Sequence, residues 1–335
     1  MVERVAENSP FALGLSHNYG MSLSPRTAEW LAMLHRIDAP RLHELPVAAA
    51  RHSYDKLMYA YAGPKEAVAS IAELKIERRS HEGGPLAVRL YRPAGSGDEI
   101  LPVVMWLHGG GWVLGSLDNY DHWCRALSNA CGVAVCALDY RLAPECRFPA
   151  AVDDAWFGLR WLMREAAGLA LDGSAISIGG DSAGGTLAAA TCLLARDAGG
   201  PLPLRQILVY PAVDLLGDYP SARRYGVAHF LEQDALRWFA HQYLETLADR
   251  EDWRASPLLA DNHAGLPAAL IINAECDPLA DQGVAYARVL EACGVPVRHV
   301  VHAGMAHGYV TMFKLFDEAR AALGEIARAL HEPWA

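Results

Sequence analysis

The spacing of apolar residues changes twice along this chain of 335 residues. Near the N-terminus, apolar positions recur at helical intervals in segments 27–37 and 47–63. Ser24-Pro25 supplies an N-cap and a first helical residue for one segment, Pro46 begins the other, and Gly63-Pro64 ends it. We therefore predict that the first 70 or so residues are largely helical.

The apolar spacing then shortens to two residues. Leu74 and Ile76 alternate with charged residues, and Leu86, Val88 and Leu90 alternate again after the turn sequence HEGGP. This pattern predicts an antiparallel hairpin with one exposed face.

From Pro102 onward, short apolar runs recur without alternation. They are PVVMWL (102–107), GVAVCAL (132–138), AISIGG (175–180), RQILVY (205–210), AALIINA (268–274) and VRHVVH (297–302). Helical patterns, such as 148–167 and 183–199, lie between several of them. Strands that are apolar on both faces and alternate with helices predict a parallel sheet covered by helices on both sides.

One interval, between Pro211 and Pro267, is too long for a single helix and contains the helix-like segment 233–247. An insertion here would lie above the carboxyl edge of the sheet, where open α/β folds bind ligands. We therefore predict a cap in two parts. Residues 1–70 supply its N-terminal helical part, and the catalytic domain, residues 71–335, carries a cap insertion at about 215–255.

Composition excludes several classes of partner. The formal net charge is 29 − 39 = −10, which argues against nucleic acid, an anionic membrane or a polyanionic substrate. No apolar run is long enough to span a bilayer, and residues 1–15 lack the pattern of a secretion signal. The 7 Cys are odd in number and include no C-x-x-C pair, so we expect buried thiols in a reducing, cytoplasmic compartment and no zinc site.

The sequence Gly180-Asp181-Ser182-Ala183-Gly184 lies between a predicted strand and a predicted helix. G-x-S-x-G alone is a weak signal, but this context is the one in which the serine occupies a sharp, exposed turn as a nucleophile. A serine hydroxyl also needs a base that accepts its proton.

The candidate base is His307, which follows the last predicted strand among small residues. Imidazole can accept and return a proton near neutral pH. His299 and His302 fall in or at the end of the strand, and His108 is expected to anchor its own loop by hydrogen bonds.

The candidate orienting carboxylate is Asp277, directly after the run 268–274 and before Pro278. Glu275 and Asp281 compete for this role; the first lies within or beside the strand and the second on the next helix. With Asp277, the chain order Ser182, Asp277, His307 is that of the α/β-hydrolase fold.

Three consecutive glycines, Gly109, Gly110 and Gly111, follow a buried strand. Backbone N–H groups can surround an oxyanion only where no side chain blocks them. We therefore expect an oxyanion hole on this loop, completed by the N–H of Ala183; a flexible hinge is the alternative interpretation.

Together these motifs resemble the hormone-sensitive-lipase-like branch of the α/β-hydrolases, bacterial esterase family IV. The matching motifs are HGGGW (108–112), DYRLAPE (139–145), GDSAGG (180–185), DPL (277–279) and HGY (307–309). The resemblance covers residues 70 to 330 and implies a mostly parallel, eight-stranded sheet with helices on both faces and a helical cap.

The resemblance also implies residue roles. It makes Ser182 the nucleophile, Asp277 the acid and His307 the base, and it places the N–H groups of Gly110, Gly111 and Ala183 in the oxyanion hole. Gly109, a less favoured donor for the oxyanion hole, is expected to contribute to the substrate pocket with Trp112, Asp181 and Tyr309. Tyr309 is expected at the rim, where many members carry Phe, and a core aromatic is the alternative interpretation of Trp112. Arg141 and Glu145 are expected to tie loops near the site.

The function that follows is a serine carboxylesterase without cofactor or metal, acting on acyl groups of about two to eight carbons. An amidase or deacetylase that uses the same triad is an alternative, and a non-catalytic ligand-binding relative is another. We expect a small-molecule ester as the substrate, no nucleic-acid or membrane partner, and a possible homodimer formed through the edge strand and last helix.

Overall fold

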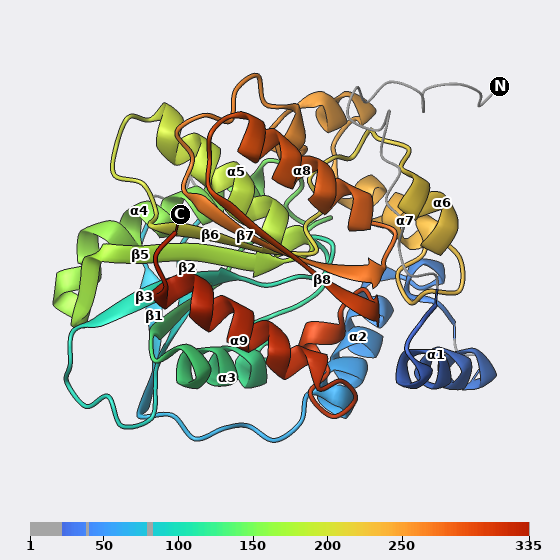
Figure 1. Ribbon diagram of the computed structural model, residues 1–335, viewed down its shortest axis with the longest axis horizontal. Coiled ribbons are helices and arrows are strands. Elements are labelled where there is room, and N and C mark those ends of the chain that lie inside the picture. Colours follow the sequence, from blue (N-terminus) through green and yellow to red (C-terminus); the bar gives the residue numbers. More distant parts are fainter. Residues whose placement is uncertain (1–21, 38–39, 79–82, 335) are drawn as a thin grey trace.

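The computed structural model describes residues 22–37, 40–78 and 83–334 (Figure 1). Its centre is an eight-stranded sheet in the order β1-β2-β4-β3-β5-β6-β7-β8. The strands are β1 (Ser70–Ile76), β2 (Leu86–Arg92), β3 (Leu101–Leu107), β4 (Ala134–Asp139), β5 (Leu171–Asp181), β6 (Arg205–Val209), β7 (Ala268–Cys276) and β8 (Val297–Ala306). The predicted α/β-hydrolase architecture is confirmed, because β1 and β2 are antiparallel and the strands from β4 to β8 pair in parallel.

Each apolar pattern from which a strand was predicted corresponds to a strand in the structure. The hairpin pairs Leu74 with Val88 in the expected antiparallel register. Strands β5 and β8 are longer than their apolar runs, and both extend to the residue that precedes a candidate catalytic side chain. The turn residues 79–82 lie outside the described ranges.

Helices cover both faces of the sheet, and each face has its own apolar core. On one face lie α3 (Asp121–Cys131) and α9 (Glu318–His331), packed around Trp106, Leu127 and Ile326. On the other lie α4 (Ala150–Glu165), α5 (Ala183–Asp197) and α8 (Ala280–Ala292). Burial on both sides explains why these strands are apolar without alternation.

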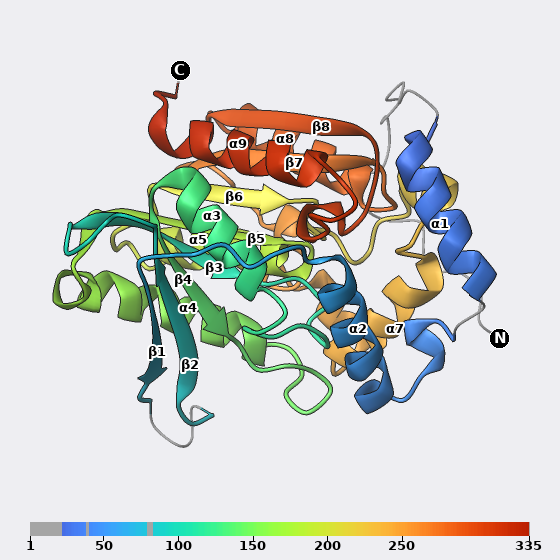
Figure 2. The same ribbon diagram turned by 90° about the horizontal axis from the view of Figure 1, so that it is seen from below.

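The remaining helices gather at the end of the sheet toward which the parallel strands point (Figure 2). They are α1 (Pro25–Ile37), α2 (Val47–Tyr61), α6 (Pro220–Tyr225) and α7 (Gln233–Tyr243). The predicted start of α1 is confirmed, since Ser24 Oγ accepts the N–H of Thr27 at 3.2 Å. Residues 1–21, the first part of the predicted cap, lie outside the described ranges.

Helix α7 is shorter than the pattern 233–247 predicts. It ends at Tyr243, and Leu244 is extended and buried. The carbonyl of Tyr243 accepts the N–H of Phe148 at 2.8 Å instead of continuing the helical ladder. A tertiary contact therefore overrides the local helical pattern.

All seven cysteines fall within the described ranges and are free thiols, five of them buried. Within the described ranges, no helix combines the length and apolar character needed to cross a bilayer.

Candidate active site

Three candidate catalytic residues follow the carboxyl ends of three strands. Ser182 follows β5, Asp277 follows β7, and His307 follows β8. The carboxyl ends of parallel strands share one edge of a sheet, so residues far apart in the chain meet there.

Ser182 occupies the sharp turn between β5 and α5. Its φ of 54° and ψ of −122° are unfavourable for a residue with a side chain, and its N–H donates to the carbonyl of Val209 at 2.8 Å. Gly184 permits the turn, because a Cβ there would lie 1.9 Å from the carbonyl oxygen of Leu107. The small residues around Ser182 are therefore a steric requirement of the turn.

The three side chains form one hydrogen-bonded line. His307 Nε2 lies 2.9 Å from Ser182 Oγ, and His307 Nδ1 lies 2.6 Å from Asp277 Oδ2. The second oxygen of Asp277 accepts the N–H of Leu279 at 2.8 Å, and the carboxylate is fully buried. The structure thus brings together the predicted nucleophile, base and acid.

The competing residues lie elsewhere. His299 and His302 are on β8, as the sequence suggested. The carboxylate of Glu275 accepts a hydrogen bond from the N–H of Gly304 at 2.7 Å. The carboxylate of Asp281, on α8, accepts one from the N–H of Ser221 at 2.8 Å. Each competing carboxylate therefore binds a backbone N–H group and not the imidazole of His307.

The glycine loop after β3 presents N–H groups beside Ser182. Those of Gly110, Gly111 and Ala183 donate to no residue in the described ranges, and all three residues line the same cavity as Ser182 and His307. Gly110 has φ +121°, and a Cβ there would lie 2.2 Å from the carbonyl oxygen of Leu114. A side chain at this position would displace the loop.

Gly109 differs from its neighbours. Its N–H points to Asp181 Oδ1 at 3.1 Å and to the hydroxyl of Tyr120 at 3.0 Å, and Tyr120 donates to Asp181 Oδ2 at 2.7 Å. Burial raises the pKa of Asp181 to about 6, although the Tyr120 hydrogen bond and the nearby His307 act in the opposite direction. Gly109 and Asp181 therefore hold the loop in place. Asp181 lines the cavity as expected, whereas Gly109 does not, so the expectation that Gly109 contributes to the substrate pocket is wrong.

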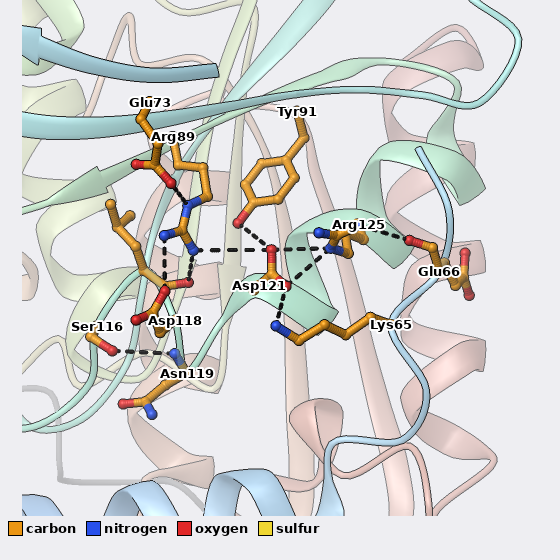
Figure 3. A network of polar contacts seen from close by, with 11 residues as sticks. Lys65, Glu66, Glu73, Arg89, Tyr91, Ser116, Asp118, Asn119, Asp121 and Arg125 are labelled. Carbon is orange, nitrogen blue, oxygen red and sulfur yellow. Dashed lines mark hydrogen bonds and ion pairs between the residues drawn. The ribbon is translucent and has the colours of Figure 1, made fainter. Parts of the chain in front are cut away.

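The segment that carries Tyr120 is clamped by a network of charged residues (Figure 3). Arg89 donates to the carbonyl of Leu117 at 3.0 Å and to Asp118 at 2.8 Å. Asp121 receives Lys65 Nζ at 2.6 Å and Arg125 Nε at 3.0 Å. Burial would raise the pKa of Asp121, but these two cations outweigh it and hold the pKa below its usual range. This network fixes the start of α3 and, with it, Tyr120.

A cavity of about 950 Å³ opens above Ser182. Its apolar lining comes from α1, α2, α7 and the segment before α7, and includes Leu31, Leu57, Met58, Phe230, Leu236 and Phe239. Trp112 also lines it; the indole is buried and stacks on Tyr243 with ring centroids 4.3 Å apart.

The expectation that Tyr309 forms the rim of the pocket is wrong. The side chain is fully buried and does not line the cavity. Its ring packs against Tyr210, and its hydroxyl is 2.9 Å from His302 Nδ1. The 3-10 turn that begins at Tyr309 directs the side chain into the core beneath His307.

Comparison with known proteins places this geometry in a family. A family model described as having the α/β-hydrolase fold matches residues 104–311. The chain is an α/β hydrolase. Its sequence motifs and relatives agree with the hormone-sensitive-lipase-like branch, so the resemblance found in the sequence is confirmed.

Three relatives of this α/β hydrolase illustrate the similarity. The ethyl acetate hydrolase of Pseudomonas putida is 39% identical over 321 residues, covering 93% of this chain and 99% of the relative. The hyperthermophilic esterase of Pyrobaculum calidifontis is 39% identical, with a TM-score of 0.86 and coverage of 92% and 98%. An ester hydrolase from the metagenome of Lake Arreo, solved with a bipyridine phosphonate derivative, is 34% identical, with a TM-score of 0.88 and coverage of 92% and 98%.

The DYRLAPE segment ties loops of the α/β hydrolase together. Arg141 donates to the buried carboxylate of Asp154 on α4 at 2.6 Å. The carboxylate of Glu145 accepts hydrogen bonds from both terminal nitrogens of Arg51 on α2, at 2.6 and 2.7 Å. The expected structural contacts of Arg141 and Glu145 are therefore present, and the second joins a helix above the sheet to the loop beside the site.

Sequence reasoning missed several residues of the site, among them Tyr120, Phe239, Arg250 and Gln282, which line the cavity. None lies in a recognisable motif, and their positions depend on how distant segments pack. Within the described ranges, no group of three or more His, Cys, Asp or Glu side chains is arranged to hold a metal ion.

Proposed function

We propose that this α/β hydrolase is a serine carboxylesterase that hydrolyses short- and medium-chain esters through an acyl-enzyme. The observation that carries the proposal is the continuous hydrogen-bonded line from Ser182 through His307 to Asp277. The names of the relatives, ethyl acetate hydrolase and esterase, support the same reaction.

The proposed mechanism follows from this geometry. Ser182 Oγ attacks the ester carbonyl while His307 Nε2 accepts its proton, and Asp277 holds Nδ1–H so that Nε2 faces the serine. The N–H groups of Gly110, Gly111 and Ala183 stabilise the negative oxygen of the tetrahedral intermediate. His307 returns the proton to the leaving alcohol, and water repeats the sequence on the acyl-enzyme.

We further propose that residues 1–70 and about 215–255 act as a cap that limits substrate length. Support comes from α1, α2 and α7, whose apolar side chains line the cavity of about 950 Å³. A series of 4-nitrophenyl esters tests this proposal: kcat/KM should be largest between two and eight acyl carbons. A maximum at twelve or more carbons would contradict it.

The same triad could cleave amides or acetamido groups, so matched ester and amide substrates decide between an esterase and an amidase or deacetylase. We expect the ester to be strongly preferred, because an amide carbonyl is less electrophilic than an ester carbonyl and its nitrogen must be protonated before it can leave. Turnover of neither substrate by folded protein would favour a ligand-binding protein.

We also propose a cytoplasmic location and a homodimer. The seven free thiols support a reducing compartment. Strand β8 is at the sheet edge with Val301 exposed, which supports pairing of two copies through this strand and α9. Light scattering after size exclusion tests the oligomeric state.

A further inference from the structure

Arg250 differs from the other three arginines that line the cavity. Each of the others forms an ion pair with a carboxylate, and the pairs are Arg41–Glu232, Arg223–Asp218 and Arg237–Asp234. Within the described ranges, the half-buried Arg250 has no such partner, and its buried Nε donates no hydrogen bond. The terminal nitrogens of Arg250 also donate no hydrogen bond within the described ranges and are not buried in the same way, so they are the donors that an acceptor from a ligand could satisfy.

Gln282 provides a second donor in the lining of the same cavity. The residue is only 6% exposed, and its Oε1 accepts the N–H of Asp214 at 3.0 Å. Its amide N–H groups donate to nothing in the described part of the chain, yet the residue lines the cavity. Gln282 therefore presents free donors while its acceptor is occupied.

The two donors are tied to consecutive residues of the loop after β6. Gln282 is bound to Asp214, as described above. The N–H of Leu215 donates to Ser256 Oγ at 3.0 Å, and Ser256 Oγ donates to the carbonyl of Arg250 at 2.8 Å. The adjacent backbone N–H groups of Asp214 and Leu215 thus connect to Gln282 directly and to Arg250 through Ser256.

The acidic residues near these two donors are held by other groups of the protein. Asp214 is 1% exposed and accepts the N–H groups of Leu216 and Gly217 and the hydroxyl of Tyr219. Asp218 is paired with Arg223, and Asp249 accepts the N–H of Thr246 at 2.7 Å. Asp214 and Asp249 keep their negative charge, so binding of a carboxylate depends on Arg250, whose positive charge is not paired with a carboxylate in the described ranges.

We propose that Arg250 and Gln282 form a carboxylate-binding subsite, and that the preferred substrates are esters that carry one free carboxylate. The subsite deepens the esterase function proposed above and depends on it. Hydrogen bonds between a carboxylate and a guanidinium are charge-assisted and are stronger in a partly buried site than in water. The cavity lining also includes the apolar side chains of Leu236 and Phe239, which can contact the apolar part of such a substrate.

The test compares charged and neutral esters of similar shape. One pair, 4-nitrophenyl hydrogen adipate and 4-nitrophenyl hexanoate, places the carboxylate on the acyl side. The other pair, 4-acetoxybenzoate and 4-methylphenyl acetate, places it on the alcohol side. The measured quantity is the ratio of kcat/KM for the charged ester to that for the neutral ester, which is independent of the fraction of active enzyme.

In at least one pair, Arg250→Gln should lower this ratio by about 10-fold to 100-fold, mainly through KM. Arg250→Lys should restore part of it. Gln282→Glu keeps the acceptor for the N–H of Asp214 but adds a negative charge, so it should lower the ratio as well. The matched control is Arg237→Gln, which removes an exposed and already paired cavity arginine and should change the ratio by less than about twofold.

Unchanged ratios in both pairs for Arg250→Gln and Gln282→Glu would overturn the subsite while leaving the esterase intact. Turnover of the neutral esters by the unaltered protein tests the esterase separately. If those esters are not hydrolysed, the proposed function fails and the subsite fails with it.

Discussion

The backbone N–H of Gly109 donates to Asp181 Oδ1 at 3.1 Å, so the residue before the nucleophile holds the loop that carries the proposed oxyanion amides. One carboxylate thereby couples the position of Ser182 to the positions of Gly110 and Gly111. Tyr120 completes the contact by donating to the other oxygen of Asp181 at 2.7 Å.

Asp181 should give the protein a specific dependence of stability on pH. Burial raises its pKa in the folded state to about 6, above its ordinary value of 3.8, so the folded protein binds this proton more tightly than the unfolded chain. Its contribution to the free energy of unfolding should therefore fall by about 2 kcal/mol as pH rises from 4 to 6. Urea unfolding across this range should give a slope of stability against pH that is more negative in the unaltered protein than in Asp181→Asn; equal slopes would contradict the assignment.

Gly110→Ala should damage catalysis more than folding. The added Cβ meets the carbonyl oxygen of Leu114 at 2.2 Å, which forces the loop and its N–H away from the oxyanion. The expected loss in kcat is about 10²-fold to 10³-fold. Gly95→Ala is the control, because Gly95 also has a positive φ (+80°) but has open space around it. If both variants keep full kcat, the loop does not serve the oxyanion.

Asp277→Asn should lower kcat by on the order of 10⁴-fold with little change in fold, since the amide no longer holds the proper tautomer of His307. Asp281→Asn is the companion variant. It weakens the contact to the N–H of Ser221 and should cost stability, with kcat reduced by less than about tenfold. The reverse order of effects would assign the acid to Asp281.

Arg51→Ala should loosen α2 from the catalytic domain. Arg51 donates to the carbonyls of Val113 and Ala143 at 2.9 and 3.0 Å as well as to Glu145. Removing it leaves two carbonyls unpaired, and the expected cost is about 1–3 kcal/mol in the free energy of unfolding, with faster hydrogen exchange in α2.

Glu145→Gln is the matched control for Arg51. It removes only an exposed charge, and the expected cost is below about 1 kcal/mol. Equal effects of the two substitutions would mean that the ion pair, and not the carbonyl contacts, holds α2.

The sequence was sufficient to predict the sheet and the residues that meet at its edge. Continuous apolar runs identify parallel strands, and residues that directly follow such strands share one edge, so Ser182, Asp277 and His307 could be named from position and chemistry. The steric need for small residues around the turn, such as Gly184, follows from the same reasoning.

Other parts of the site depend on packing that no local pattern encodes. Tyr309 is two residues from His307, yet a 3-10 turn directs it into the core. Helix α7 ends early because the carbonyl of Tyr243 accepts a hydrogen bond from the N–H of Phe148, which lies 95 residues earlier in the chain. Arg250 lies in a polar stretch without a motif, and its lack of a carboxylate partner in the described ranges becomes evident only once the neighbouring ion pairs are known.

The most direct test of the triad is reaction of the folded protein with an alkyl 4-nitrophenyl phosphonate, followed by intact mass and peptide mapping. The tetrahedral phosphonate should form one adduct per chain, on Ser182, and His307→Ala should slow labelling by at least about 10²-fold. No adduct on folded protein, an adduct on another residue, or equal labelling rates in the two proteins would contradict the proposal that His307 activates Ser182.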